Sequence, residues 1–152
     1  MRGFTVIEIL LVVVLMGIVA GIVVPSYHGP YQALVLKNTT DSAVSLMRYA
    51  QAQATLKHVP YQFNCDPDKH YFWLSRAVID DQGEVSGVEA IADRMGRRVD
   101  VPHNVNLDCE HQEMVFLPDG TISKNKIKLS NNKKTFTVSS YEQRGYVLVY
   151  DD

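Results

Sequence analysis

The stretch GFTVIEILLVVVLMGIVAGIVVP, residues 3–25, decides the fold class that we predict for this chain. Between Phe4 and Val24 it contains a single charged residue, Glu8. About 20 apolar residues are enough to cross the hydrocarbon core of a bilayer. A carboxylate inside such a segment costs roughly 2.5–3.5 kcal/mol on insertion scales. Glu8 is therefore a candidate functional residue, because its position needs a compensating interaction.

The composition limits the classes of function. The chain has 152 residues, with 15 basic and 17 acidic side chains and a net charge of −2. This length has room for one domain and an appendage, and nucleic-acid-binding domains are usually far more basic. The sequence contains no Ser-His-Asp, Cys-His, paired-carboxylate or phosphate-loop pattern. We therefore expect a protein that is not an enzyme and that has no cofactor and no metal.

The apolar segment has three interpretations. A secretory signal peptide has an apolar core of about 7–15 residues, which is shorter than this run. A plain transmembrane anchor fits the length but does not explain the carboxylate. The third interpretation comes from a resemblance.

The motif Gly3-Phe4-Thr5-Val6-Ile7-Glu8, followed by an aliphatic run and Pro25, resembles the N-terminus of type IV pilins and type II secretion pseudopilins. The resemblance implies that a prepilin peptidase cuts between Gly3 and Phe4 and that the new Phe4 amine is N-methylated. Residues 1–3 are then a leader peptide, shorter than usual and with one basic residue. Residues 4–30 form a hydrophobic transmembrane and assembly helix, and residues 31–152 form a globular pilin-like head.

The resemblance gives the acidic residue a role. In such filaments, the carboxylate of an incoming subunit is thought to meet the Phe4-equivalent amine of a subunit that is already assembled. Two charges that are costly apart in an apolar medium become tolerable as a pair, and a carboxylate is favoured at the positive end of a helix dipole. Glu8 is therefore interpreted as a filament assembly contact. The implied partners are other pilins or pseudopilins, the prepilin peptidase and inner-membrane lipid.

The remainder of the chain predicts an α+β fold of the pilin-like kind. A helical face with steps of three and four is followed by Val59-Pro60, which ends the helix. From there the pattern has period two, which is typical of strands. Residues 77–104 are harder to assign, because 80–84 and 95–98 are loop-like, and short strands are possible there. We expect the long N-terminal helix to pack on an antiparallel β-sheet. The helical face comprises Leu36, Thr40, Ala43, Met47, Ala50 and Ala54. The expected strands are 61–65, 70–74, 105–107, 114–117, 127–129, 135–138 and 146–149.

Three further stretches narrow the resemblance to the minor pseudopilins of the GspH/FimT type. They are Met47-Arg48-Tyr49-Ala50-Gln51-Ala52 in the helix, Phe116-Leu117-Pro118-Asp119-Gly120-Thr121, and Gly145-Tyr146-Val147-Leu148-Val149. The resemblance covers nearly the whole chain and is weakest across residues 75–104.

The two cysteines, Cys65 and Cys109, both follow the apolar segment. With Arg2 on the cytoplasmic side, the positive-inside rule places the head in the periplasm of a single-pass inner-membrane protein. Oxidising compartments favour disulfides, so we expect a Cys65–Cys109 bridge. The alternatives are two buried free thiols, or a zinc site that also uses His70 and His111, although no close ligand spacing supports zinc.

The other polar clusters have weaker interpretations. Two acidic clusters could bind calcium, but neither has EF-hand spacing and solvated turns are expected. Lys124, Lys126 and Lys128 alternate, which would place all three on one sheet face, either as a solvated surface or as a contact for DNA phosphates. The aromatic run 71–73 is expected to pack mainly in the core. The acidic clusters are Asp66/Asp68 and Asp80/Asp81/Glu84, and a second small basic cluster is Arg94, Arg97 and Arg98.

The sequence thus predicts a non-enzymatic minor pseudopilin, a structural subunit at or near the tip of a type II secretion pseudopilus or a type IV pilus. Such a subunit moves from the bacterial inner membrane into a periplasmic or extracellular filament, where exported cargo is a further candidate partner. The alternative function is that of a DNA-binding minor pilin for DNA uptake in natural transformation, with the three alternating lysines as the contact.

Overall fold

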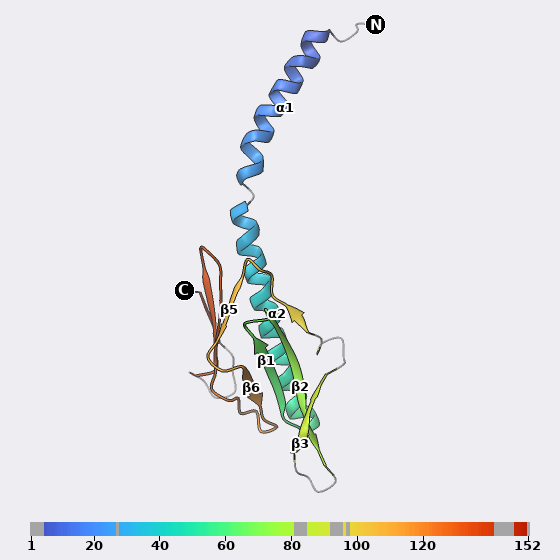
Figure 1. Ribbon diagram of the computed structural model, residues 1–152, viewed down its shortest axis with the longest axis vertical. Coiled ribbons are helices and arrows are strands. Elements are labelled where there is room, and N and C mark those ends of the chain that lie inside the picture. Colours follow the sequence, from blue (N-terminus) through green and yellow to red (C-terminus); the bar gives the residue numbers. More distant parts are fainter. Residues whose placement is uncertain are drawn as a thin grey trace. The chain divides into compact units, whose positions relative to one another are not determined.

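The computed structural model of the chain divides into two compact units, Met1–Gln32 and Ala33–Asp152, and each is described on its own (Figure 1). The structure describes residues 5–26, 28–80, 85–91, 96, 98–141 and 148–151. Two helices are followed by nine strands along the chain in this described part.

The first unit contains the helix α1, Val6–Ser26. The carbonyl oxygen of Thr5 accepts hydrogen bonds from the amides of Glu8 and Ile9, which starts the helix. Among residues 6–21, whose side chains the structure describes, the large apolar side chains are exposed on every side, from 44% for Val12 to 82% for Val6. Over the residues that the structure describes, no helix meets the combination of length and hydropathy required to cross a membrane.

The second helix, α2, His28–Lys57, supplies one side of the head core. The helical face predicted from the sequence is confirmed, because each of its six residues is at most 2% exposed. Its one hydroxyl, that of Thr40, is satisfied by donating to the carbonyl oxygen of Leu36 at 3.0 Å. The helix ends before Val59-Pro60, as expected from the conformational restriction that proline imposes.

The first sheet has strand order β3-β2-β1-β6, with β4 also paired to β2. All of its pairings are antiparallel. The predicted hairpin is present, and Cys65 lies opposite Phe72 beside the turn. In that turn the Lys69 amide donates to Asp66 Oδ1 at 3.0 Å. The strands are β1 Tyr61–Asp66, β2 Tyr71–Ile79, β3 Val85–Ala90, β4 Val99–Asp100 and β6 Glu113–Phe116.

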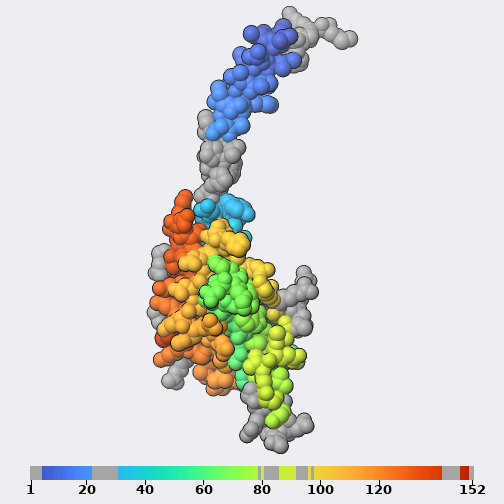
Figure 2. Space-filling view, in the orientation of Figure 1, coloured from blue at the N-terminus to red at the C-terminus, as the bar shows by residue number. Residues whose placement is uncertain are grey.

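The second sheet has strand order β5-β7-β8-β9 and is also antiparallel. Its strands are β5 Asn106–Cys109, β7 Lys126–Ser130, β8 Thr135–Ser139 and β9 Leu148–Asp151. The predicted strand 146–149 therefore begins outside the described residues and continues to residue 151. In the space-filling view, the two sheets lie side by side on one face of the head (Figure 2).

One hydrophobic core joins α2 to the inner faces of both sheets. Alternation along each strand decides which residues enter it. Residues 61, 63 and 65 of β1 are buried in the core, as are 72 and 74 of β2 and 127 and 129 of β7. Because side-chain direction alternates along a strand, the opposite faces carry the more polar residues, and these are the faces open to other molecules.

The alternation also separates the aromatic run. Phe72 is fully buried and its ring lies 5.4 Å from that of Phe63. Tyr71 and Trp73 lie on the opposite face of β2, half-buried, with their ring centroids 5.0 Å apart. The expectation that this cluster packs mainly in the core is therefore wrong for two of the three rings, because adjacent strand residues point to opposite faces.

Besides the shared core, a disulfide and a buried side-chain amide link the two sheets. The disulfide between Cys65 on β1 and Cys109 on β5 is present, and the sequence separation of its cysteines is 44 residues. The second connection is the buried amide of Asn125, immediately before β7. It donates to the carbonyl oxygens of His111 at 2.8 Å and Glu113 at 3.0 Å, and it accepts from the amides of His111 and Lys126.

Candidate functional site

The start of α1 carries the residue singled out by the sequence. Glu8 lies in the first turn of the helix and is exposed. Thr5 precedes the helix by one residue, so Thr5 and Glu8 have the T-x-x-E spacing of a capping box. The position is also at the positive end of the helix dipole, which favours a carboxylate. Gly3 and Phe4, the predicted cleavage and methylation positions, lie outside the described residues.

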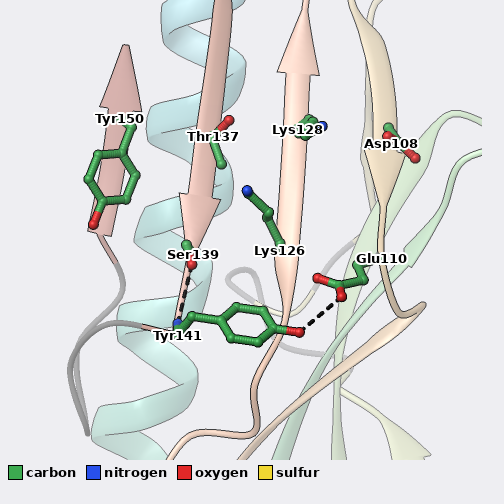
Figure 3. Close-up of a pocket in the computed structure, with 8 residues that line it drawn as sticks. All are labelled: Asp108, Glu110, Lys126, Lys128, Thr137, Ser139, Tyr141 and Tyr150. Carbon is green, nitrogen blue, oxygen red and sulfur yellow. Dashed lines mark hydrogen bonds between the residues drawn. The ribbon is translucent and has the colours of Figure 1, made fainter. Parts of the chain in front are cut away.

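The outer face of the second sheet carries a groove, which we call the β8 groove (Figure 3). Strand register brings its residues together, because Asp108 pairs with Lys128, Lys128 with Thr137, and Thr137 with Tyr150. Lys126 pairs with Ser139 one step along the strands. The groove has a volume of about 710 Å³. Its lining residues are Asp108, Glu110, Lys126, Lys128, Thr137, Ser139, Tyr141 and Tyr150.

The depth of the β8 groove follows from side-chain size. Thr137 and Ser139, on β8, form its floor and are only 3% and 6% exposed although they face outward. The neighbouring strands carry longer side chains, lysines on β7 and Tyr150 on β9, which rise on either side of these small hydroxyl residues (Figure 3). The groove therefore follows the direction of β8.

Tyr141 closes one end of the β8 groove. Its phenolic hydroxyl donates to Glu110 Oε1 at 3.0 Å, and its backbone amide donates to Ser139 Oγ at 3.2 Å (Figure 3). The hydrogen bond to the carboxylate, together with partial desolvation and the nearby negative charge, raises the pKa of Tyr141 above its usual value. Protonated Tyr141 thus holds the Glu110 side chain against the end of the groove.

Charged groups of both signs line the β8 groove without neutralising one another directly. Asp108 and Lys128 are cross-strand neighbours. Within the described part of the chain, however, the ion pairs closer than 4.0 Å all lie elsewhere in the head, and none involves Lys126, Lys128 or Asp108. These groups are therefore able to pair with a ligand.

The three lysines singled out by the sequence are all exposed. Lys126 and Lys128 point from the same face of β7, as their alternation predicts, while Lys124 precedes the strand and does not line the β8 groove. The sequence interpretation missed Asp108 and Glu110. Asp108 and Glu110 have the same two-residue spacing as Lys126 and Lys128. The sequence, however, did not show which strand would lie next to theirs.

The other candidate ligand sets are not assembled. Both sulfur atoms of Cys65 and Cys109 are in the disulfide, so the zinc alternative does not apply. Among the described residues no three His, Cys, Asp or Glu side chains come together as a metal site. Asp66 instead pairs with Lys69 at 3.2 Å, and the Lys69 amide lowers the pKa of Asp66.

Two predicted clusters lie partly outside the described residues. Asp80 is described and exposed, whereas Asp81 and Glu84 are not described. Of the small basic cluster only Arg98 is described. Its guanidinium lies 3.7 Å from the centre of the Tyr71 ring and its Nε donates to Asp100 at 2.8 Å.

Comparison with known proteins identifies solved structures that have a similar fold. The search against protein-family models found no match, and no curated protein sequence matched. Among solved structures, the chain is similar to the minor pseudopilin EpsH from the type 2 secretion system of Vibrio cholerae. The TM-score is 0.64 at 15% identity, covering 75% of this chain and 94% of that one.

A second crystal structure of EpsH matches with a TM-score of 0.54 at 14% identity, covering 72% of this chain and 93% of that one. The type IV minor pilin FimU of Pseudomonas aeruginosa matches with a TM-score of 0.54 at 14% identity, covering 76% of this chain and 87% of that one. These likenesses extend over most of each chain. The chain has a type IV pilin-like fold, an α+β fold in which a helix packs on antiparallel sheet, as predicted from the sequence.

Proposed function

We propose that this chain is a non-enzymatic structural subunit, of the minor pilin or minor pseudopilin kind, that assembles into a filament through its N-terminal helix. The observation that carries the proposal is α1 itself, whose described apolar side chains are exposed all round, in a chain whose head has a pilin-like fold. A helix that is apolar on all sides is stable only when other apolar groups surround it. In a filament, the helices of neighbouring subunits are those groups.

Glu8 is proposed as the charged contact of this assembly. Its position in the first turn of α1 leaves the carboxylate exposed to a neighbouring subunit. We propose that a prepilin peptidase cuts between Gly3 and Phe4, that the Phe4 amine is then methylated, and that this amine pairs with Glu8 of the adjoining subunit. Each charge reduces the cost of placing the other in an apolar environment.

Before assembly, we propose that the subunit is held in the bacterial inner membrane with its head in the periplasm. This part of the proposal depends on the apolar sequence 4–30 and on the positive-inside rule. The Cys65–Cys109 disulfide supports it, because disulfides are typical of oxidising compartments.

The likeness to EpsH and FimU supports a minor position in the filament, at or near its tip, in either a type II secretion pseudopilus or a type IV pilus. The proposed partners are other pilins or pseudopilins and, for the exposed faces of the head, exported cargo. A role in DNA uptake is less well supported. Asp108 and Glu110 lie beside Lys126 and Lys128 and reduce the local positive potential that attracts phosphates.

The decisive experiment is Glu8→Gln in the full chain, expressed in a strain that lacks the native copy. Glutamine retains the capping ability of the side chain and removes only its charge. We expect the variant to be made at the normal level but to be depleted at least tenfold from sheared, purified filaments, as measured by quantitative immunoblotting. Mass spectrometry of the mature wild-type chain is expected to show an N-methylated Phe4 at the N-terminus.

The matched control is Asp41→Asn, which removes a carboxylate from an exposed position of α2. It is expected to assemble at the wild-type level. Full incorporation of Glu8→Gln would rule out the charge-pair contact, and a mature chain that keeps Met1 or Arg2 would rule out the processing.

A further inference from the structure

We propose that the β8 groove binds an extended polypeptide segment that carries carboxylates at alternate positions. The proposal is independent of the filament role of α1, because all the residues that form the groove belong to the head.

The direction and spacing of the β8 groove indicate a chain in extended conformation. Its floor is a run of small hydroxyl residues along β8, and its cationic wall is the pair Lys126 and Lys128 on β7. Side chains two residues apart on a strand are separated by about 6.6–6.8 Å. An extended peptide that lies along β8 has the same repeat, so two of its side chains on one face can reach both lysines.

The chemistry of the walls selects carboxylates on the ligand. The ammonium group of Lys126 is directed over the groove in Figure 3, on the side that faces β8 and Tyr150. Neither lysine makes an ion pair within the described residues, although carboxylates lie one strand away. Hydrogen bonds between ammonium and carboxylate groups are about twice as strong as those between neutral groups.

The same walls disfavour a polyanion. Asp108 and Glu110 lie behind the two lysines on and after β5, so the charges of the described lining residues sum to zero. A nucleic acid carries a negative charge at every nucleotide and gains affinity by replacing its counterions with many cations. A peptide with two carboxylates uses the two lysines without bringing further negative charge close to Asp108. We therefore assign the groove to polypeptide.

The test uses the full chain in nonionic detergent at an ionic strength of about 0.15 M, where long-range charge effects are largely screened. The probe is a fluorescein-labelled, end-blocked tetrapeptide of alternating glutamate and threonine, which carries two carboxylates, and binding is measured by fluorescence anisotropy. The comparison probe has glutamine in place of glutamate, and short oligothymidylate serves as the nucleic-acid probe. The expected result is that the glutamate peptide binds at least tenfold more tightly than either of the other probes.

Paired variants locate the site. The double substitution K126Q/K128Q is expected to weaken binding of the glutamate peptide at least tenfold. The matched control K124Q/K133Q removes the same charge from exposed lysines that do not line the groove, and a change below twofold is expected. Asp108→Asn is expected to tighten binding, because it removes a repelling carboxylate. Melting curves of each variant establish that the head is folded.

Amide shift changes in the wild-type chain give a test without substitutions. On addition of the glutamate peptide, the largest changes are expected at Thr137 and Ser139 of the floor. Equal weakening by the two double substitutions, absence of shifts at the floor, or tighter binding of oligothymidylate through Lys126 and Lys128 would each overturn the assignment.

Discussion

The apolar residues of α1 and those of the head are of the same chemical types but in opposite surroundings. In α1, Leu10 and Leu11 are 58% and 57% exposed, whereas Leu36 and Leu74 of the head are fully buried. In the head, the apolar residues are buried within one chain, because α2 packs against two sheets. The apolar surface of α1 remains for other molecules to cover. Hydrophobicity therefore predicts that a residue will be covered, while the fold decides whether the covering group belongs to the same domain or to another molecule.

The substitution with the greatest predicted loss of stability acts on the core of the head and not on α1. Phe72→Ala removes a fully buried ring that stacks on Phe63. We expect the free energy of unfolding of the head to fall by about 3–5 kcal/mol, the range for large-to-small changes at buried aromatic positions. Denaturant unfolding of the full chain in nonionic detergent, followed by the fluorescence of Trp73, measures it.

The matched substitution Leu10→Ala tests the other half of the comparison. The head midpoint is expected to stay unchanged, because this side chain belongs to the first unit. Filament incorporation is expected to fall instead. A head destabilised equally by both substitutions would show that the two units are energetically coupled.

The second effect concerns the covalent link between the sheets. The double substitution C65A/C109A is expected to lower the stability of the head by about 2–4 kcal/mol, because the unfolded chain gains the freedom that the closed loop removes. Denaturant midpoints of the wild-type and substituted chains, with and without reductant, measure the loss. Reductant should lower the midpoint of the wild-type chain alone, and an equal response of both chains would contradict the prediction.

The third effect concerns the polar link between the sheets. Asn125→Ala leaves the amide of His111 and the carbonyl oxygens of His111 and Glu113 without their side-chain partner. A loss of about 1–3 kcal/mol is expected, because these groups are partly buried and water replaces the missing amide only in part. Thermal melting measures it.

Asn131→Ala is the control for this substitution, since the Asn131 side chain accepts from the amides of Lys133 and Lys134 in an exposed turn. Its loss should be below about 1 kcal/mol, because water can replace the missing acceptor. Equal losses would contradict the linking role of Asn125.

The smallest effect is a pH dependence in the turn after β6. Asp119 Oδ1 accepts from the amide of Thr121 at 2.8 Å, and this bond lowers the pKa of the carboxyl group. A lowered pKa stabilises the fold above the unfolded value, near 3.8, and this contribution disappears as the pH falls through the folded pKa. Melting temperatures of the wild type and Asp119→Asn, measured at pH 6 and at strongly acidic pH, should differ less in acid. A constant difference would refute the linkage.

Local patterns predicted the elements more accurately than their neighbours in space. The helical face of α2 and the hairpin of β1 and β2 followed from periodicity and from the Asp66-Pro67-Asp68 turn. The turn at Pro118-Asp119-Gly120 is also present, and Gly120 has a φ of 84°, which favours glycine. These features depend on residues that are close in sequence.

The features that depend on distant residues could not be predicted. The sequence pattern did not show that the strands divide into two sheets, because alternation identifies a strand but not its partner. The short strand Val85–Ala90 contains Gly87 and Glu89 and has no clear alternation, so the sequence indicated only that short strands were possible in residues 77–104. Only some of the residues that line the β8 groove were predicted from the sequence. Lys126 and Lys128 followed from spacing, whereas Asp108 reaches them only through the pairing of β5 with β7.

The disulfide between β1 and β5 turns the segment between its cysteines into a closed ring that contains β2, β3 and β4. A protease that cuts the backbone once inside this ring releases no fragment, because the two new ends remain joined through sulfur. The head should therefore survive a single nick there as one covalent particle, and the cut should appear on a gel only after reduction. Such a ring gives the head tolerance to a single backbone cut between its two cysteines.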